Sequence, residues 1–216
     1  MAQGYTKSGR QHYANSGHQP FRHPKRCTIE LMFDYSDGSE ICDSQGLRVE
    51  KFTVRRIDES DLEDFRRVRL EALLLHPEAF GASYEDWNQK PAQFFGDLLR
   101  ENHMIGGFDI HNNLQGIIGV RRSDSPKLSH VATIWGVYVR PEMRGSGLSR
   151  KLMEAALEAT YSAKIVKLSV LTSNHTARAL YRSYGFTEWA IDTAALCVNG
   201  VFHDEFLMKR ESELSA

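Results

Sequence analysis

Features that define several specialised protein classes are scarce in this chain. Three cysteines in 216 residues are too few for a dense, evenly paired disulfide framework, and they fit a reducing compartment better. No uninterrupted apolar run approaches the roughly 18 residues that span a bilayer. Lys and Arg (27) nearly balance Asp and Glu (28), whereas a nucleic-acid binder or a polybasic membrane anchor needs a basic excess. We therefore expect a cytoplasmic globular protein that binds neither nucleic acid nor membrane.

Acidic residues are missing from the first 29 positions, which contain five Lys or Arg and three His. This stretch has few aliphatic residues and no helix or strand period, so it cannot bury enough surface to offset its ordering entropy. The apolar core of a secretory signal and the apolar face of a transit peptide are also missing. We expect 1–50 to be a disordered or non-homologous extension and 51–216 to be one domain.

Patterned sequence begins near Leu47 and contains no internal repeat. The expected strands are Leu47–Ile57, Met104–Ile110, Gln115–Arg122, His130–Val139, Val166–Thr172, Trp189–Val198 and Val201–Lys209. The first expected helix begins at a Ser60/Glu63 capping box and ends before Pro77, and a loop through Phe80, Gly81 and Tyr84 follows it. The other expected helices are Pro91–Glu101, Gly147–Ala163 and Ala177–Tyr184. Gly185 should end the last helix, and Asn199-Gly200 should form a type I′ hairpin turn. This alternation predicts one α/β (α+β) layered domain.

The segment between the fourth expected strand and the following helix has the pattern of an anion-binding turn. Free N–H groups and the positive helix end would face the anion, and glycines would let it approach the backbone. Arg144 and Arg150 add positive charge, although Gly145 and Gly147 by themselves also fit a plain tight turn. A Rossmann fingerprint would need a small residue at Arg150, and a Walker loop would need Gly-Lys-Ser/Thr.

With these residues the sequence resembles the GNAT superfamily of acetyl-CoA-dependent N-acetyltransferases. The family hallmark, Arg/Gln-x-x-Gly-x-Gly/Ala, is matched by residues 144–149, with Ser149 where the family prefers Gly or Ala. A second family pattern, N-x-x-A-x-x-L-Y-x-x-x-G-F, is matched from Asn174 to Phe186. The segment Arg69–Asp86 is similar to a bacterial branch of the superfamily.

The resemblance covers about residues 52–209 and implies a fold and a cofactor site. The fold would have a mixed central sheet of about six to seven strands flanked by helices, with a V-shaped splay between the fourth and fifth strands. Pantetheine would pair with the backbone of Val137 and Val139 in the splay, and the diphosphate would lie on the N–H groups of 145–150. The implied acetyl-CoA-binding residues are Val137, Tyr138, Val139, Arg144, Gly145, Ser146, Gly147, Leu148, Ser149, Arg150, Asn174, Ala177 and Tyr181.

The resemblance also implies a general acid. Tyr181 lies at the family's general-acid position, four residues before Gly185. A phenol with a pKa of about 10 stays protonated at neutral pH, so it can donate a proton to the departing thiolate. A packing role for this ring is the alternative. No base is assigned; the candidates, each more typical of a surface group, are Glu71, Glu85, Glu142 and His130.

Other candidate residues have ordinary structural explanations. The aromatic residues that would line an acceptor channel, or simply fill the core, are Phe80, Tyr84, Trp87, Trp135 and Tyr138. Cys197 has no histidine motif nearby, so we expect a buried strand residue and not a nucleophile. The histidines lack metal-ligand spacing, so we expect no metal.

The function implied by the resemblance is direct acetyl transfer from acetyl-CoA to a primary amine. The acceptor stays open between a small metabolite, a polyamine, an aminoglycoside-like compound and a protein amino group. The alternatives are a longer acyl donor and a CoA-binding regulatory module without transferase activity. A homodimer also stays open, because the last two strands often pair across subunits in this superfamily.

Overall fold

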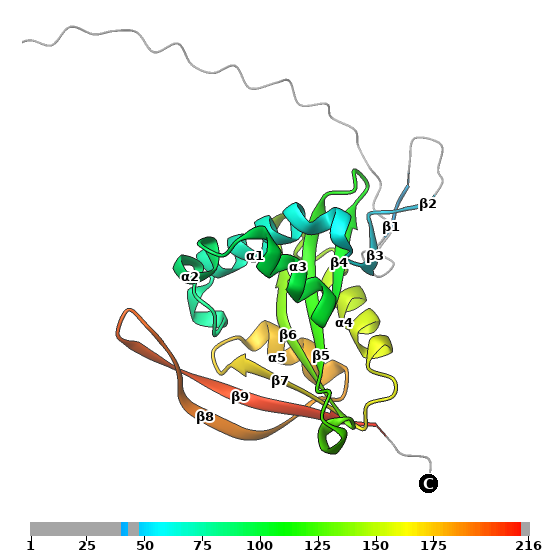
Figure 1. The fold of residues 1–216 in the computed structure, drawn as a ribbon. Coiled ribbons are helices and arrows are strands. Elements are labelled where there is room, and N and C mark those ends of the chain that lie inside the picture. Colours follow the sequence, from blue (N-terminus) through cyan, green and yellow to red (C-terminus); the bar gives the residue numbers. More distant parts are fainter. Residues whose placement is uncertain (1–39, 43–47, 213–216) are drawn as a thin grey trace, which may run out of the picture. The chain divides into compact units, whose positions relative to one another are not determined.

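The computed structural model describes residues 40–42 and 48–212 (Figure 1). Strands β1 (Glu40–Cys42) and β2 (Arg48–Glu50) pair antiparallel with each other, and the rest of the predicted extension lies outside the described residues. The prediction of one strand over Leu47–Ile57 is wrong. A bend at Lys51 separates β2 from β3 (Phe52–Arg56), because β2 pairs with β1 whereas β3 pairs with β4.

The main sheet has seven strands in the order β3-β4-β5-β6-β7-β9-β8. After β3 its strands are β4 (His103–Asp109), β5 (Leu114–Arg122), β6 (Val131–Val139), β7 (Ile165–Leu171), β8 (Thr187–Val198) and β9 (Val201–Glu211). Neighbours run antiparallel except for β6 and β7, which are parallel. The predicted mixed sheet of six to seven strands is confirmed.

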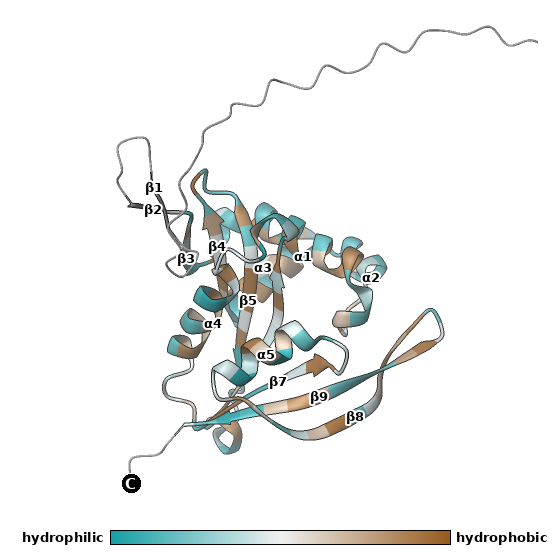
Figure 2. Cartoon of the chain, turned by 180° about the vertical axis from the view of Figure 1, so that it is seen from behind, coloured by the Kyte–Doolittle hydropathy of each residue, from teal (hydrophilic) through white to brown (hydrophobic). Residues whose placement is uncertain are grey.

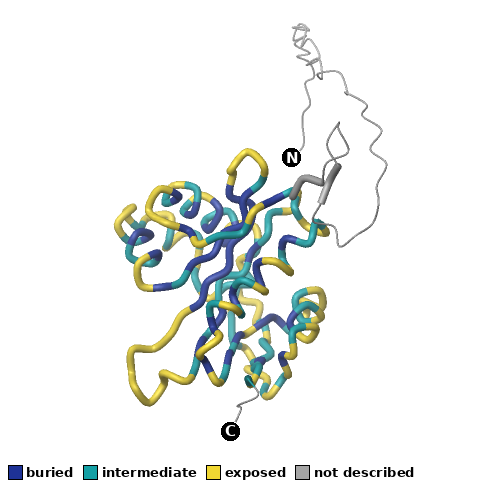
Figure 3. The backbone as a smooth tube through the Cα atoms, turned by 90° about the vertical axis from the view of Figure 1, so that its right-hand side faces the viewer, coloured by how far each residue is buried: buried dark blue, intermediate teal, exposed yellow. Residues whose placement is uncertain are grey.

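Helices cover both faces of this sheet. They are α1 (Leu62–Leu75), α2 (Tyr84–Asn88), α3 (Ala92–Glu101), α4 (Leu148–Ala159) and α5 (His175–Ser183). Buried residues of α1 and α3 pack with Phe108 and Ile117 in one cluster, while those of α4 and α5 pack with Ile118 and Ile134 in another. The central strands between the two clusters are mainly hydrophobic (Figure 2) and buried (Figure 3). Within 48–212, no helix is both long and apolar enough to cross a membrane.

Two local predictions near the first helix need correction. The capping residue is Asp58, not Ser60: its side chain accepts a hydrogen bond from the Ser60 N–H, and the Asp61 side chain accepts one from the Asp58 N–H. Arg55 fixes Asp61 in place with two hydrogen bonds of 2.6 and 2.8 Å. The expected loop around Tyr84 is helix α2, which is capped by the Ser83 hydroxyl.

The predicted turn residues lie where their chemistry requires. Asn199 (φ 51°) and Gly200 (φ 80°) both have positive φ, as a type I′ turn needs, and they join β8 to β9. Gly185 (φ 83°) follows the last residue of α5 and its cap, Tyr184.

Strands β6 and β7 pair only at their first residues, from Val131 opposite Ile165 to Thr133 opposite Lys167. Beyond that point they diverge, so the predicted splay between the fourth and fifth strands is confirmed. A bulge lies where they separate: Gly136 (φ 63°) and Val137 together oppose a single residue of β5.

The bulge reverses which side chains of β6 face each layer. Ala132 and Ile134 pack on the α4 side, and simple alternation would place Tyr138 there too. Because one residue is inserted, Val137 and Val139 join the α4 side instead, while Tyr138 packs with α1 and α3.

The tight contact between α4 and β4 gives a stability prediction. A Cβ at Gly107 would overlap Leu148 Cδ1, and Leu148 is fully buried, so it has no free space to enter. Gly107→Ala should therefore lower the free energy of unfolding by about 1–3 kcal/mol. The matched control is Gly96→Ala in α3, where a Cβ would meet only the Arg100 side chain tip at 3.4 Å. That change should add about 0.5–1 kcal/mol, because alanine favours the helix. Urea unfolding measures both; equal effects would contradict this account.

Candidate functional site

A cleft of about 1470 Å³ opens where β6 and β7 diverge. It runs from the turn after β6, past the bulge, to the segments around η2 (Pro77–Ala79) and α2. Within the described residues, no strand pairs with the side of β6 that faces β7 beyond Thr133. The cleft therefore has an exposed strand edge along one wall, which can hydrogen-bond an extended ligand.

The turn between β6 and α4 presents backbone N–H groups at one end of the cleft. Gly145 (φ 78°) and Gly147 (φ 91°, the N-cap of α4) both have positive φ, which favours glycine. Three of the turn's N–H groups are used internally. They are those of Ser146, to the Met143 carbonyl, Leu148, to the Ser146 hydroxyl, and Arg150, to the Gly147 carbonyl.

The remaining N–H groups of this turn, at Gly145, Gly147 and Ser149, have no hydrogen-bond partner in the part of the chain that the structure describes. They lie at the positive end of the α4 dipole. The space beside Gly145 is open, because no atom lies within 4 Å of where its Cβ would be. The turn therefore has the donors and the room that an anion needs.

Helix α5 contributes Asn174 and Tyr181 to the cleft. Asn174 is the N-cap of α5, and its Oδ1 accepts a hydrogen bond of 3.0 Å from the Ala177 N–H. Tyr181 is 5% exposed, and its hydroxyl makes no hydrogen bond to another described residue. Burial raises the pKa of Tyr181 to about 12, so the phenol keeps its proton at neutral pH.

Behind the cleft, three polar side chains form a hydrogen-bonded cluster. Tyr138 Oη donates to Glu71 Oε1 at 2.9 Å, and Arg140 Nε donates to the same oxygen at 2.9 Å. Burial and the hydrogen bond to Glu71 raise the pKa of Tyr138 to about 12. Burial acts to raise the pKa of Glu71, but the bonds from Arg140 and Tyr138 outweigh it and lower the pKa. Glu71 is therefore a poor general base.

Most of the predicted cofactor-binding residues come together in this cleft. Those that line it are Val137, Tyr138, Val139, Arg144, Gly145, Ser149, Arg150, Asn174, Ala177 and Tyr181. The other three, Ser146, Gly147 and Leu148, are not among the residues that line it. One predicted pairing group is occupied: the Val139 carbonyl accepts a hydrogen bond of 3.2 Å from Arg144 Nε.

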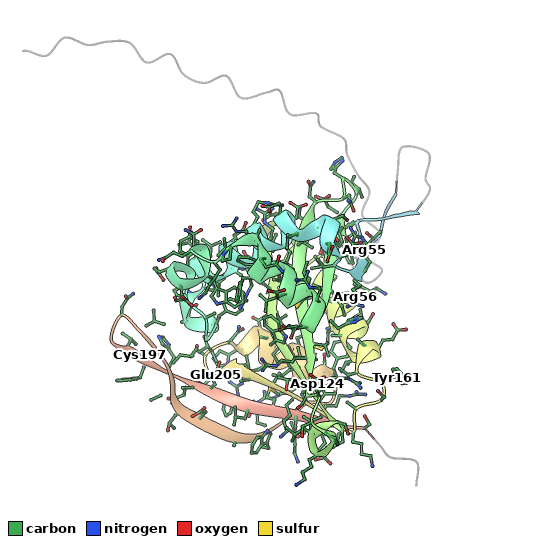
Figure 4. All side chains as sticks on the ribbon, viewed as in Figure 1. Arg55, Arg56, Asp124, Tyr161, Cys197 and Glu205 are labelled. Carbon is green, nitrogen blue, oxygen red and sulfur yellow. The ribbon has the colours of Figure 1, made fainter. Side chains whose placement is uncertain are left out.

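The candidate base and acceptor-channel residues differ in whether they line the cleft. Glu85, Glu142 and His130 are exposed and do not line the cleft, whereas Phe80, Trp87 and Trp135 do. The prediction that Cys197 is buried is wrong. It is exposed near the tip of the β8–β9 hairpin (Figure 4), on the strand face opposite to that of its neighbour Leu196, which lines the cleft.

Sequence reasoning missed several charged residues that line the cleft, which are Arg69, Glu101, Arg121, Arg122, Asp124 and Glu205. Arg69 is 3% exposed on α1, and Glu205 lies on β9 opposite Leu171 of β7 (Figure 4). A charged residue gives no sequence signal of burial, and β9 reaches the cleft only through long-range pairing. Across the described residues, no group of three or more His, Cys, Asp or Glu is arranged to hold a metal ion.

Comparison with known proteins identifies a family model and curated relatives. The model of the Acetyltransferase (GNAT) family matches residues 56–186. A mycothiol acetyltransferase from Kocuria rhizophila is 31% identical over 163 residues, 71% of this chain and 50% of that protein. The N-alpha-acetyltransferase RimI of Mycobacterium tuberculosis is 32% identical over 124 residues, 56% of this chain and 75% of that protein. The chain spans about half the length of the mycothiol acetyltransferases that it matches.

Solved structures share the fold at low identity. A GNAT-family acetyltransferase from Streptococcus pneumoniae has a TM-score of 0.65 and 18% identity, covering 74% of this chain and 99% of that one. The structure of yncA from Salmonella typhimurium with its cofactor acetyl-CoA has a TM-score of 0.63 and 18% identity, covering 76% and 96%.

The cluster behind the cleft predicts a pH-dependent stability. The pKa of Glu71 is lowered, so its contribution is present above the ordinary value of 4.5 and is lost as the pH falls through the folded-state value. Glu71→Gln should lower the free energy of unfolding by about 1–2 kcal/mol at pH 7, and the difference from wild type should shrink below pH 4.5. Glu142→Gln is the control, because Glu142 also pairs with Arg140 but its side chain is 51% exposed. Urea unfolding between pH 3 and 7 measures both, and a larger loss for Glu142→Gln would contradict the cluster.

Proposed function

The chain belongs to the acetyltransferase (GNAT) family, and we propose that it transfers an acetyl group from acetyl-CoA directly to a primary amine. The observation that carries this proposal is one cleft with three parts: a strand edge and the N–H groups of Gly145 and Ser149, all without partners among the described residues, and the Tyr181 side chain. Its relatives named as acetyltransferases support the reaction type.

Acetyl-CoA fits the groups that the cleft presents. Its diphosphate would take the N–H groups of the turn, with Arg144 and Arg150 beside them as exposed cations. Its pantetheine arm would pair with the edge of β6 at Val137 and Val139. Because Arg144 Nε bonds the Val139 carbonyl, this arm would have to displace that contact. Asn174 would bind the arm in addition to capping α5.

Acetyl-CoA supplies an acetyl group activated as a thioester. In the transfer, the amine nitrogen forms a bond to the acetyl carbon while the carbon–sulfur bond breaks. Tyr181 donates its hydroxyl proton to the departing sulfur, and its raised pKa of about 12 keeps that proton available at neutral pH. The amine must lose a proton to attack, and water in the open cleft can accept it; Glu71 is excluded as base by its ion pair with Arg140.

We also propose a domain boundary, a cellular location and an oligomeric state. The enzymatic domain covers 51–216, and the protein is cytoplasmic. Two copies pair through the β8–β9 hairpin, which carries the exposed apolar side chains Trp189, Ile191, Val201 and Phe202.

The transfer reaction is tested by following thiol release from acetyl-CoA across a panel of amines. Small amine metabolites, polyamines, aminoglycosides and N-terminal peptides represent the acceptor classes. Release with at least one class supports the proposal. Tight CoA binding without thiol release in the presence of any amine would favour a regulatory CoA-binding module. Thiol release only from longer acyl-CoA compounds would show that the acyl donor is not acetyl-CoA.

The role of Tyr181 gives the first prediction for this function. Tyr181→Phe should lower kcat about a hundredfold, because the departing sulfur loses its proton donor. The affinity for acetyl-CoA, measured by calorimetry, should not change. Tyr184→Phe is the control: Tyr184 does not line the cleft, and its hydroxyl bonds the backbone carbonyl of Arg150 and the Glu154 side chain, so this variant should retain wild-type kcat. A Tyr181→Phe enzyme with full kcat would leave the ring with a packing role alone.

Ser149 tests the diphosphate assignment through charge. Ser149→Glu places a carboxylate in the first turn of α4, where an acid stabilises the helix but repels an anion. The free energy of unfolding should stay the same or rise, while the Kd for acetyl-CoA should rise at least about tenfold. Ser149→Gln has nearly the same size without charge, so it should bind more tightly than Ser149→Glu. Equal Kd values for the two variants would argue against a phosphate at this turn.

A further inference from the structure

The wall of the cleft contains an arginine, Arg69, that has no counter-ion among the described residues. Arg69 of α1 is 3% exposed, and its Nε and Nη1 are buried without a hydrogen-bond partner within the described residues. Burying a charge without a partner is costly, and a site that tolerates this cost usually has a use for the charge. Burial lowers the pKa of Arg69 to about 10, so the side chain is still a cation at neutral pH.

Aromatic rings fix the position of this cation. The guanidinium carbon lies 4.7 Å from the ring centre of Phe80, 4.8 Å from that of Trp87 and 5.6 Å from that of Trp135. Such contacts attract a cation, but ring faces offer no acceptor for its N–H groups. These three rings form an aromatic cage that holds the guanidinium in one place and leaves its N–H groups free to donate hydrogen bonds.

The location of the cage points to the acceptor and not to CoA. Nη1 of Arg69 would be 3.5 Å from a Cβ at Gly136, so the guanidinium packs against the bulge of β6. Arg69 and the three rings all line the cleft: Arg69 lies on α1, Trp87 on α2, Phe80 directly after η2 and Trp135 on β6. The N–H groups proposed for the diphosphate lie instead at the start of α4, where Arg144 and Arg150 are exposed.

We propose that Arg69 binds a carboxylate of the acceptor, so that the substrates are amino acids or other small amines that also carry a carboxylate. This inference rests on the acetyl transfer proposed above. A carboxylate matches the forked N–H geometry of a guanidinium and would satisfy the buried donors. An amine of a polyamine or an aminoglycoside placed at Arg69 would instead bring two like charges together, which disfavours it at this position. The carboxylates that line the cleft, Glu101, Asp124 and Glu205, belong to other segments than the residues around Arg69.

The experiment compares a panel of L-amino acids with their C-terminal amides, using thiol release from acetyl-CoA. The amide differs in the carboxylate but also in the basicity of its amine, so the informative quantity is the acid-to-amide ratio of kcat/KM in each variant. The ratio for Arg69→Met should be roughly ten- to a hundredfold below the wild-type ratio, mainly through a higher KM for the acid. Arg69→Lys keeps the positive charge but loses the forked N–H geometry of the guanidinium, so its acid-to-amide ratio should lie between those of the wild type and Arg69→Met.

The matched control is Arg66→Met on the same helix. Arg66 also stacks on an aromatic ring, with 5.6 Å between its guanidinium carbon and the ring centre of Phe95, and its Nε is also buried without a partner. Arg66 does not line the cleft, so this variant should keep the wild-type ratio. An unchanged ratio in Arg69→Met, or an equal fall in Arg66→Met, would overturn the proposal. Melting temperatures confirm that each variant is folded, and Arg69→Lys decides the question if Arg69→Met is not.

A separate readout distinguishes this inference from the proposed function. If no amine supports transfer, the transferase proposal fails, but Arg69 can still be tested by thermal shift in the presence of CoA. N-acetyl-L-amino acids should then stabilise the wild type more than their amides do, and Arg69→Met should lose this difference. If neither compound stabilises the wild type, or both stabilise it equally, the carboxylate site is wrong.

Discussion

A single inserted residue in β6 governs the geometry of the cleft. The positive φ of Gly136 lets two residues of β6 oppose one of β5, and pairing with β7 has already ended at Thr133. The insertion places Val137 and Val139 on the α4 side and Tyr138 on the α1 side. Without it, the alternation of a regular strand would exchange these side chains between the two layers. The Glu71 cluster, which contains Tyr138, and the surface at Gly136 on which Arg69 packs both depend on this bulge.

Local chemistry explains which parts of the fold the sequence could predict. Asn199, Gly200 and Gly185 occur where the backbone needs positive φ, and such residues mark turns whatever lies around them. The turn of residues 144–149 was recognisable for the same reason, because its glycines and the following helix form one continuous segment. The main sheet and four of the helices were therefore predictable to within a few residues at their ends.

The errors and omissions arise where distant residues decide the outcome. Asp58 replaces Ser60 as the cap because its partner Asp61 is held by Arg55 from the preceding strand. Cys197 lies in a strand of apolar composition, yet it is exposed because it lies on the strand face opposite to that of Leu196, which lines the cleft. Arg69 has the opposite environment: residues from three separate segments enclose a side chain that sequence patterns place on the surface.

Burial shifts the pKa values of Tyr181 and Arg69 in opposite directions for the same physical reason. Low solvent access raises the pKa of Tyr181 and lowers that of Arg69, since in each case it disfavours the charged form. For the tyrosine this keeps the phenol protonated at neutral pH, as the proposed role of proton donor requires. For the arginine it leaves a charge whose electrostatic interactions are stronger than they would be in water. A carboxylate that entered the cleft would relieve this cost, whereas a second cation would increase it. The same exclusion of water thus keeps the proton on Tyr181 and leaves Arg69 as a cation whose charge acts strongly on whatever enters the cleft.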